Sequence, residues 1–105
     1  MLKINLEFRK GILFVRPKGS LTRYTHKCLE NYLIEVIKEH GIKYLVYNLE
    51  GVSVIDSHGK KSLKKGIAAA KKNKGKGAIC NTKNILHKNI KILDNELAAI
   101  GEFQF

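Results

Sequence analysis

The chain opens with a segment in which apolar and polar residues alternate. Apolar side chains occupy every second position over 3–8, which predicts a strand with one apolar face. The segment Arg9-Lys10-Gly11 predicts a turn, and the apolar run of 12–16 predicts a second strand. Pro17 and Gly19 are expected to end that strand. The pattern therefore predicts an opening β-hairpin.

Two longer segments change to the spacing of an amphipathic helix. From about Arg23 to Glu39, apolar residues recur every three or four positions until Gly41 ends the pattern. The apolar stripe of this helix consists of Cys28, Leu29, Tyr32, Leu33, Val36 and Ile37. A second helix is predicted to begin near Ser57 or His58 and to end near Asn73, with apolar residues on one arc and lysines on another.

The remaining apolar runs complete the predicted fold. The near-continuous run of 44–49 is typical of a central strand that is buried on both faces. A short strand is predicted over 77–81, a third helix over 84–93 and a closing strand over 102–105. Strands separated by helices imply parallel neighbours. We therefore predict one α/β domain over 1–105, with a mixed four- to five-stranded sheet and helices packed mainly on one face.

A serine is predicted to lie where this central strand gives way to the lysine-rich helix. A short loop and an apolar patch over 52–55 lead into Asp56-Ser57-His58-Gly59. The start of a helix offers unpaired backbone N–H groups and the positive end of the helix dipole, which favour a phosphate. The position suggests that Ser57 is modified rather than that it attacks a substrate. The same geometry would also suit Ser57 as a plain helix N-cap.

The charge of the chain is strongly positive, with a formal net charge of +11. Seventeen of the twenty basic residues are lysine, and eight lie in 60–76, a segment without any acidic residue. Such a field attracts an acidic partner, a nucleic acid or an anionic surface. Lysine without arginine or interleaved aromatic residues is, however, a weak signal for nucleic acid. Three interpretations stay open: a solvated helix face, a partner-specific patch, or a nonspecific polyanion surface.

Other kinds of chemistry find little support in the sequence. Cys28 and Cys80 belong to no CxxC pair and no Cys/His set has metal-ligand spacing, so we interpret both as small buried residues and predict no metal. The chain contains neither GxxxxGK nor GxGxxG, which argues against a nucleotide cofactor. A hydrolase would need a base and an orienting acid for Ser57, and none is evident. No run approaches the ~20 apolar residues of a membrane span, so we expect a cytosolic protein without membrane contacts.

The order of these elements, with the serine loop in this place, resembles the STAS domain of bacterial anti-sigma-factor antagonists. Gly19-Ser-Leu21 follows the second strand, where the family has Gly-x-Leu-Asp. Residues 45–49 and 52–55 match its apolar strand and the following turn. Asp56-Ser57-His58-Gly59 matches its Asp-Ser-Ser-Gly, and residues 70–75 resemble the end of its second helix. The likeness covers almost the whole chain.

The resemblance implies a non-catalytic regulatory switch with Ser57 as the phosphoacceptor. The family's partner is an anti-sigma factor that is also a serine kinase of the histidine-kinase-like ATPase type. The unphosphorylated antagonist binds that kinase and releases a sigma factor, phosphorylation breaks the complex, and a serine phosphatase resets it. The antagonist itself holds no ATP, and we expect a monomer or weak dimer. The partner-binding residues that follow from the resemblance are Thr22, Asp56, His58, Gly59, Lys60 and Lys61.

Three residues depart from the family pattern. His58 replaces the second serine, and Lys60 and Lys61 replace the usual Leu-Gly on the helix turn that faces the kinase. Thr22 stands where the family usually has an aspartate. The departures at Thr22, Lys60 and Lys61 favour an alternative, a STAS scaffold module that works with a different protein partner and without phosphorylation. A further alternative is a small basic nucleic-acid-binding domain, whose affinity would fall steeply with salt. The family's terminal helix is expected to be short or missing.

Overall fold

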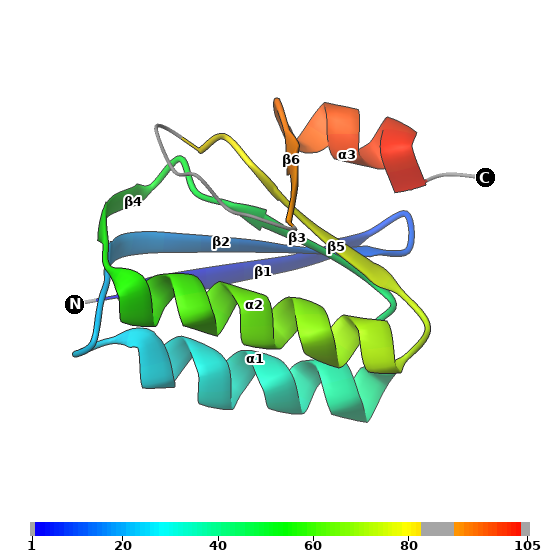
Figure 1. Ribbon diagram of the computed structural model, residues 1–105. Helices are drawn as coiled ribbons and strands as arrows, with labels where there is room; N and C mark the ends of the chain where they lie inside the picture. The colour runs from blue at the N-terminus through cyan, green and yellow to red at the C-terminus, as the bar shows by residue number, and fades with distance from the viewer. Residues whose placement is uncertain (1, 83–89, 104–105) are drawn as a thin grey trace.

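The structure is a computed structural model, which describes residues 2–82 and 90–103. In these residues, six strands form one mixed sheet in the order β1-β2-β3-β5-β6, with β4 paired to the end of β2 (Figure 1). The hairpin pair of β1 and β2 is antiparallel, and the other pairs are parallel. The strands are β1 (Lys3–Arg9), β2 (Ile12–Leu21), β3 (Tyr44–Asn48), β4 (Val52–Ile55), β5 (Lys76–Cys80) and β6 (Lys91–Leu93). The predicted α/β class is confirmed, but the sheet has six strands in the described residues rather than the predicted four to five.

The helices are α1 (His26–His40), α2 (Ser57–Lys72) and α3 (Glu96–Phe103). Figure 1 shows α1 and α2 side by side on one face of the sheet, with α3 on the opposite side. The central strands are apolar on both faces because each face packs on a helix layer. Alternate residues such as Leu45 and Tyr47 belong to the core under α1 and α2, whereas Val46 belongs to the core under α3. The prediction of helices mainly on one face is confirmed.

Strand β2 does not end at Pro17, as the sequence suggested, but continues to Leu21. Its first part pairs with β3 as far as Val15, and its last part pairs with β4 from Gly19 onwards. Pro17 lies between these two parts, where neither parallel partner needs its missing N–H. Gly19, with φ 114°, marks a register shift that redirects the strand toward Val52. The apolar patch over 52–55 is therefore a strand rather than a turn.

Helix α1 begins three residues later than predicted and has a narrower apolar stripe. Leu29, Leu33 and Ile37 are buried, but Cys28 and Tyr32 are exposed. Each of these two precedes a buried residue, and one position turns a side chain by about 100° around the helix. The prediction that Cys28 is buried was thus wrong. Cys80 is buried as predicted, and its burial raises the pKa of the thiol to about 12.

The C-terminal part of the chain differs most from prediction. Of the helix predicted over 84–93, residues 84–89 lie outside the described residues, and 91–93 form β6 beside β5. The strand predicted over 102–105 is wrong for its described part, because α3 runs to Phe103. The side chain of Asn95 accepts a hydrogen bond from the Ala98 N–H at 2.8 Å, so a capping signal starts this helix.

Candidate functional site

The start of α2 is capped by an aspartate rather than by the serine that follows it. Asp56 has extended backbone angles, φ −109° and ψ −173°, and its Oδ1 accepts a hydrogen bond from the Gly59 N–H at 3.0 Å. Ser57 is therefore the first residue inside the helix, and the N-cap interpretation of Ser57 was wrong. Its side chain is exposed, and its hydroxyl forms no hydrogen bond within residues 2–82 and 90–103.

The carboxylate of Asp56 also joins two loops. Its Oδ2 accepts a hydrogen bond from the backbone N–H of Arg23 at 2.9 Å, and the Asp56 N–H donates to the Leu21 carbonyl oxygen at 3.2 Å. The N–H groups of Gly59, Arg23 and His58 lower the pKa of Asp56 below its ordinary value, because they stabilise the charged form. Both oxygens thus accept hydrogen bonds from backbone N–H groups, and the carboxylate holds the start of α2 against the turn that follows β2.

Gly59 is required by the close approach of α2 to the end of β2. A Cβ atom at this position would lie 2.2 Å from the Leu21 carbonyl oxygen and 2.9 Å from the Ile55 Cγ1 atom. No real side chain tolerates the first distance, so the helix would have to move away from the strand. This contact explains physically why the loop of residues 56–59, the acceptor loop, ends in glycine.

Thr22 helps to build the turn that leads from β2 into α1. Its N–H donates to Thr25 Oγ1 at 2.9 Å, and its carbonyl oxygen accepts from the His26 N–H at 2.8 Å. The next residue, Arg23, holds Asp56 through its backbone, so the turn lies against the acceptor loop. The structure therefore brings Thr22 together with the acceptor loop, although they are more than thirty residues apart in sequence.

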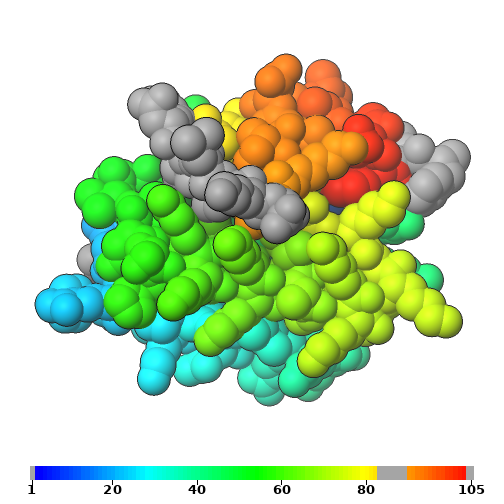
Figure 2. Space-filling model, in the orientation of Figure 1, coloured from blue at the N-terminus to red at the C-terminus, as the bar shows by residue number. Residues whose placement is uncertain are grey.

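Lys60 and Lys61 follow the acceptor loop on the first turn of α2. Lys61 is exposed and Lys60 is half-buried, and neither forms an ion pair in the described part of the chain. Figure 2 shows the side chains of α2 projecting from the near surface of the molecule. Both lysines thus lie within one helical turn of Ser57 with their charges uncompensated.

A histidine–glutamate–lysine network beside this site was missed by sequence reasoning. Glu30 is only 7% exposed, and its two oxygens lie 2.6 Å from His26 Nδ1 and 2.7 Å from Lys65 Nζ. Burial alone would raise the pKa of Glu30, but hydrogen bonds from Lys65 and His26 lower it below the ordinary value. The His26 ring centroid lies 5.5 Å from that of His58, which links the network to the acceptor loop. The i, i+4 spacing of His26 and Glu30 was the available signal.

Two large apolar side chains next to the acceptor loop are exposed to solvent. Tyr24, which follows Arg23, is 78% exposed, and Val54 in β4 is 55% exposed. The Arg23 guanidinium lies over the Tyr24 ring, 4.7 Å from its centroid. Exposed apolar groups beside a polar rim are typical of protein-binding surfaces. Sequence reasoning missed both because neither stands out in its local pattern.

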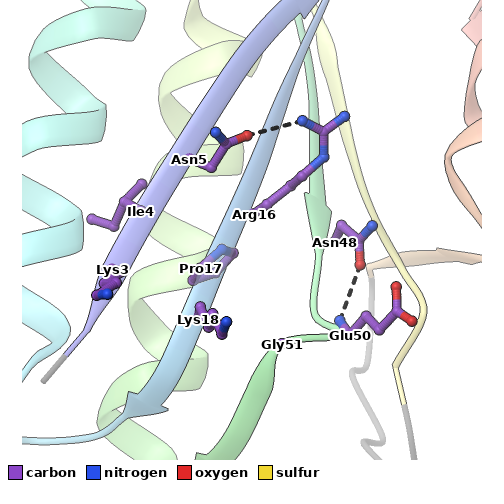
Figure 3. A pocket seen from close by; sticks show the side chains of 9 residues that line it. All are labelled: Lys3, Ile4, Asn5, Arg16, Pro17, Lys18, Asn48, Glu50 and Gly51. Carbon is purple, nitrogen blue, oxygen red and sulfur yellow. Dashed lines mark hydrogen bonds between the residues drawn. The ribbon is translucent and has the colours of Figure 1, made fainter.

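A separate hollow lies beside the strands of the hairpin, away from the acceptor loop. It has a volume of about 430 Å³ and is lined by Lys3, Ile4, Asn5, Arg16, Pro17, Lys18, Asn48, Glu50 and Gly51 (Figure 3). Arg16 donates to Asn5 Oδ1 at 2.9 Å and to both Glu96 oxygens at 2.7 Å, so its donors already have partners within the protein. The lining carries three cationic side chains, of which Arg16 is already paired within the protein, and one carboxylate, Glu50.

Other kinds of site receive no support from the described residues. Within 2–82 and 90–103, no group of three or more His, Cys, Asp or Glu side chains is placed to hold a metal ion. No described helix is both long and apolar enough to cross a membrane.

The fold and the acceptor loop define a known class of domain. The family model of the STAS domain matches residues 3–97, and the chain therefore belongs to that family. It is 25% identical over 112 residues to the anti-sigma F factor antagonist of Paenibacillus polymyxa, covering 98% of this chain and 96% of that protein. The resemblance seen in the sequence is thus confirmed.

Two solved structures of SpoIIAA share this fold. The unphosphorylated anti-sigma factor antagonist SpoIIAA superposes with a TM-score of 0.78 at 17% identity, covering 95% of this chain and 96% of SpoIIAA. The Bacillus cell fate determinant SpoIIAA in its phosphorylated form gives a TM-score of 0.66 at 17% identity, covering 78% of this chain and 75% of that chain. At these identities the likeness concerns the fold alone.

Proposed function

We propose that this protein is an anti-sigma-factor antagonist, a non-catalytic switch that binds an anti-sigma factor with serine kinase activity and is controlled by phosphorylation of Ser57. The observation that carries the proposal is the exposed Ser57 hydroxyl at the positive end of α2, next to a carboxylate already held by backbone N–H groups. The Paenibacillus relative, named an anti-sigma F factor antagonist, supports the same assignment.

The geometry suits a phosphoacceptor for three reasons. The Ser57 hydroxyl is exposed and carries no competing hydrogen bond in the described residues, so a kinase reaches it without breaking a contact. The first turn of α2 stabilises the added negative charge through the helix dipole. Lys61, four residues further along the helix, adds a cation on the same side. The modified state therefore suits this fold without a rearrangement of the helix.

The surroundings of Ser57 also fit a protein partner. Tyr24 and Val54 offer apolar contact area, and the acceptor loop with Thr22 offers backbone and hydroxyl groups between them. Phosphorylation would add about two negative charges to this surface. A partner that contacts a neutral hydroxyl there would then face a desolvated charge, so the complex would dissociate.

Phosphate transfer to Ser57 is the direct test. The protein is incubated with the anti-sigma factor kinase of its own organism and Mg-ATP, and intact mass is measured. We expect one added phosphate for the wild-type protein and for Ser53→Ala, a control at an exposed serine of β4, and none for Ser57→Ala. Undiminished phosphorylation of Ser57→Ala would overturn the assignment.

A second test asks whether charge at Ser57 is the switch. Ser57→Asp should weaken binding of the kinase more than Ser57→Ala, because only the aspartate brings a negative charge into the interface. Titration calorimetry measures both affinities. Equal values for the two variants would show that charge at this position does not control the complex.

The uncompensated lysines favour a second candidate, a STAS scaffold with a different, acidic protein partner and no phosphorylation. In that case Lys60→Glu with Lys61→Glu should slow association and flatten its salt dependence, because electrostatic steering weakens with ionic strength. Lys71→Glu with Lys74→Glu, near the far end of the helix, is the matched control. Equal effects of the two pairs would instead point to a general polyanion surface, as the nucleic-acid alternative requires.

A further inference from the structure

A second concave surface lies between the outer sides of α1 and α2. Figure 1 shows the two helices running side by side in the same direction, and the hollow between them has a volume of about 300 Å³. It is lined by Ile34, Lys38, Lys65, Ala68, Ala69, Lys72 and Asn73, which we call the lysine groove. None of these residues belongs to the acceptor loop.

The lysine groove has an apolar floor and a cationic rim. Ala69 is buried, Ile34 is half-buried, and Ala68 is an exposed alanine that leaves the floor open. Lys38 and Lys72 line the groove from the last turns of α1 and α2, and neither forms an ion pair within the described residues.

One charge of the rim is already balanced inside the protein. Lys65 binds the buried Glu30 carboxylate, with 2.7 Å between Lys65 Nζ and Glu30 Oε1. The uncompensated positive charge of the groove therefore lies at Lys38 and Lys72, on opposite walls of an apolar depression.

We propose that the lysine groove docks an acidic amphipathic helix of a protein partner. Carboxylates of that helix would pair with Lys38 and Lys72, and an apolar side chain between them would cover Ile34 and Ala68. Lys72 lies fifteen residues after Ser57 on the same helix, which places it roughly 20 Å away along the axis. The groove therefore lies toward the opposite end of α2 from Ser57.

The composition of the groove favours a peptide over a nucleic acid. Its lining contains no arginine, which would bind a phosphate through two hydrogen bonds, and no aromatic side chain, which would stack on a base. Its floor is aliphatic instead, which suits leucine-like side chains.

Lys38 and Lys72 lie in the last turns of their helices, where a cation interacts favourably with the helix dipole. Helix stability alone is therefore a sufficient reason for a lysine at each position. Lys71 shares this reason, since it lies in the same last turn of α2, but it does not line the groove. Lys71 is therefore the control that separates a dipole effect from docking.

The test uses a synthetic helical peptide of about 15 residues, long enough for four turns, built from glutamate, leucine and alanine with leucines at helical spacing. A scrambled peptide of the same composition loses the apolar stripe and keeps the charge. A single-stranded oligothymidine of matched charge represents a polyanion. Binding to the full chain is measured by fluorescence anisotropy, and amide chemical-shift mapping locates it.

We expect the patterned peptide to bind more tightly than the scrambled one and to shift the amides of Ile34, Ala68 and Ala69. Lys38→Gln with Lys72→Gln should weaken binding about tenfold, as expected for the loss of two ion pairs at the strong end of the exposed range. Lys71→Gln with Lys74→Gln should change it by less than about twofold.

Four results would overturn the proposal. Equal binding of the two peptides would mean that the apolar floor is not used. Equal loss with both lysine pairs, or tighter binding of the oligothymidine, would show a general polyanion surface. Shifts confined to the acceptor loop would place the peptide at the Ser57 surface. None of these results bears on phosphorylation of Ser57, so the two proposals stand or fall separately.

Discussion

On the face of the sheet that α3 covers, Arg16 connects β2 to Glu96 of α3 and to Glu7 of β1, with N–O distances of 2.7 and 2.8 Å. On the other face, α1 and α2 are held to the sheet by apolar packing, and most lysines of α2 are exposed. Among the lysines of α2, Lys65 alone pairs with a carboxylate in the described residues. The difference suggests that charge on the α3 face serves the fold, whereas charge on α2 is available to partners.

The largest expected effect comes from the packing of α2 on the sheet. A Cβ atom at Gly66 would lie 2.0 Å from the buried Tyr47 hydroxyl oxygen and 3.2 Å from the Leu33 Cδ2 atom. Gly66→Ala should therefore lower the free energy of unfolding by about 3 kcal/mol, because the helix must move off its core. Urea denaturation followed by circular dichroism measures the change.

Gly101→Ala is the matched control for this change on the α3 face. Nothing lies within 4 Å of the position its Cβ would take, so it should leave stability unchanged or raise it by up to about 1 kcal/mol. Equal changes in the unfolding free energy for Gly66→Ala and Gly101→Ala would show that the face covered by α1 and α2 is not packed more tightly than the α3 face.

The charge network on the α3 face should give the next largest effect. Glu96→Gln removes the charge that Arg16 and Asn48 bind, and should cost about 1–2 kcal/mol of unfolding free energy. Glu102→Gln removes an exposed pair with Lys91 and should cost less than about 1 kcal/mol. Equal costs would mean that the partial burial of Glu96 adds nothing.

Acid should weaken the same network. The hydrogen bond from Arg16 lowers the pKa of Glu96 below its ordinary value of 4.5, so its stabilising effect is fully present above that pH. As the pH falls through the lower pKa of the folded state, Glu96 is protonated and the effect is lost. The stability difference between wild type and Glu96→Gln should therefore shrink below pH 4.5. A difference that stays constant in urea titrations down to about pH 3, roughly one and a half units below that ordinary value, would contradict this assignment.

The smallest effect is expected for the lysines of α2. Lys61→Gln with Lys64→Gln should change the unfolding free energy by less than about 0.5 kcal/mol, because both side chains are exposed and lack ion-pair partners in the described chain. The midpoint of thermal unfolding at low and high salt provides the measurement. A clear loss of stability would show that these lysines support the fold after all.

The local signals of the sequence predicted most, but not all, of the elements in the N-terminal three quarters of the fold. Alternation predicted β1, helical spacing predicted α1 and α2, and the apolar run predicted β3 as a central strand. The continuation of β2 through Pro17 could not be predicted, because it depends on which partner lies on each side of the strand. The C-terminal elements were mistaken because β6 has only three residues and depends on pairing with β5.

The candidate site was predictable in outline but not in its construction. The position of Ser57 at an exposed helix start followed from the order of strand, loop and helix. The role of Asp56 did not, since its second oxygen binds Arg23, a residue brought close only by the fold. Tyr24 and Val54 were missed for the same reason, because exposure is a property of the folded surface.

The packing of Tyr47 beneath α2 gives the protein a natural optical reporter. The chain has four tyrosines and no tryptophan, and Tyr47 is fully buried with its hydroxyl unpaired among the described residues. Burial raises the pKa of Tyr47 far above that of an ordinary phenol. After a jump to alkaline pH, tyrosinate absorbance from this residue would therefore develop only as molecules open. Its rise would time the opening of the core without an added label.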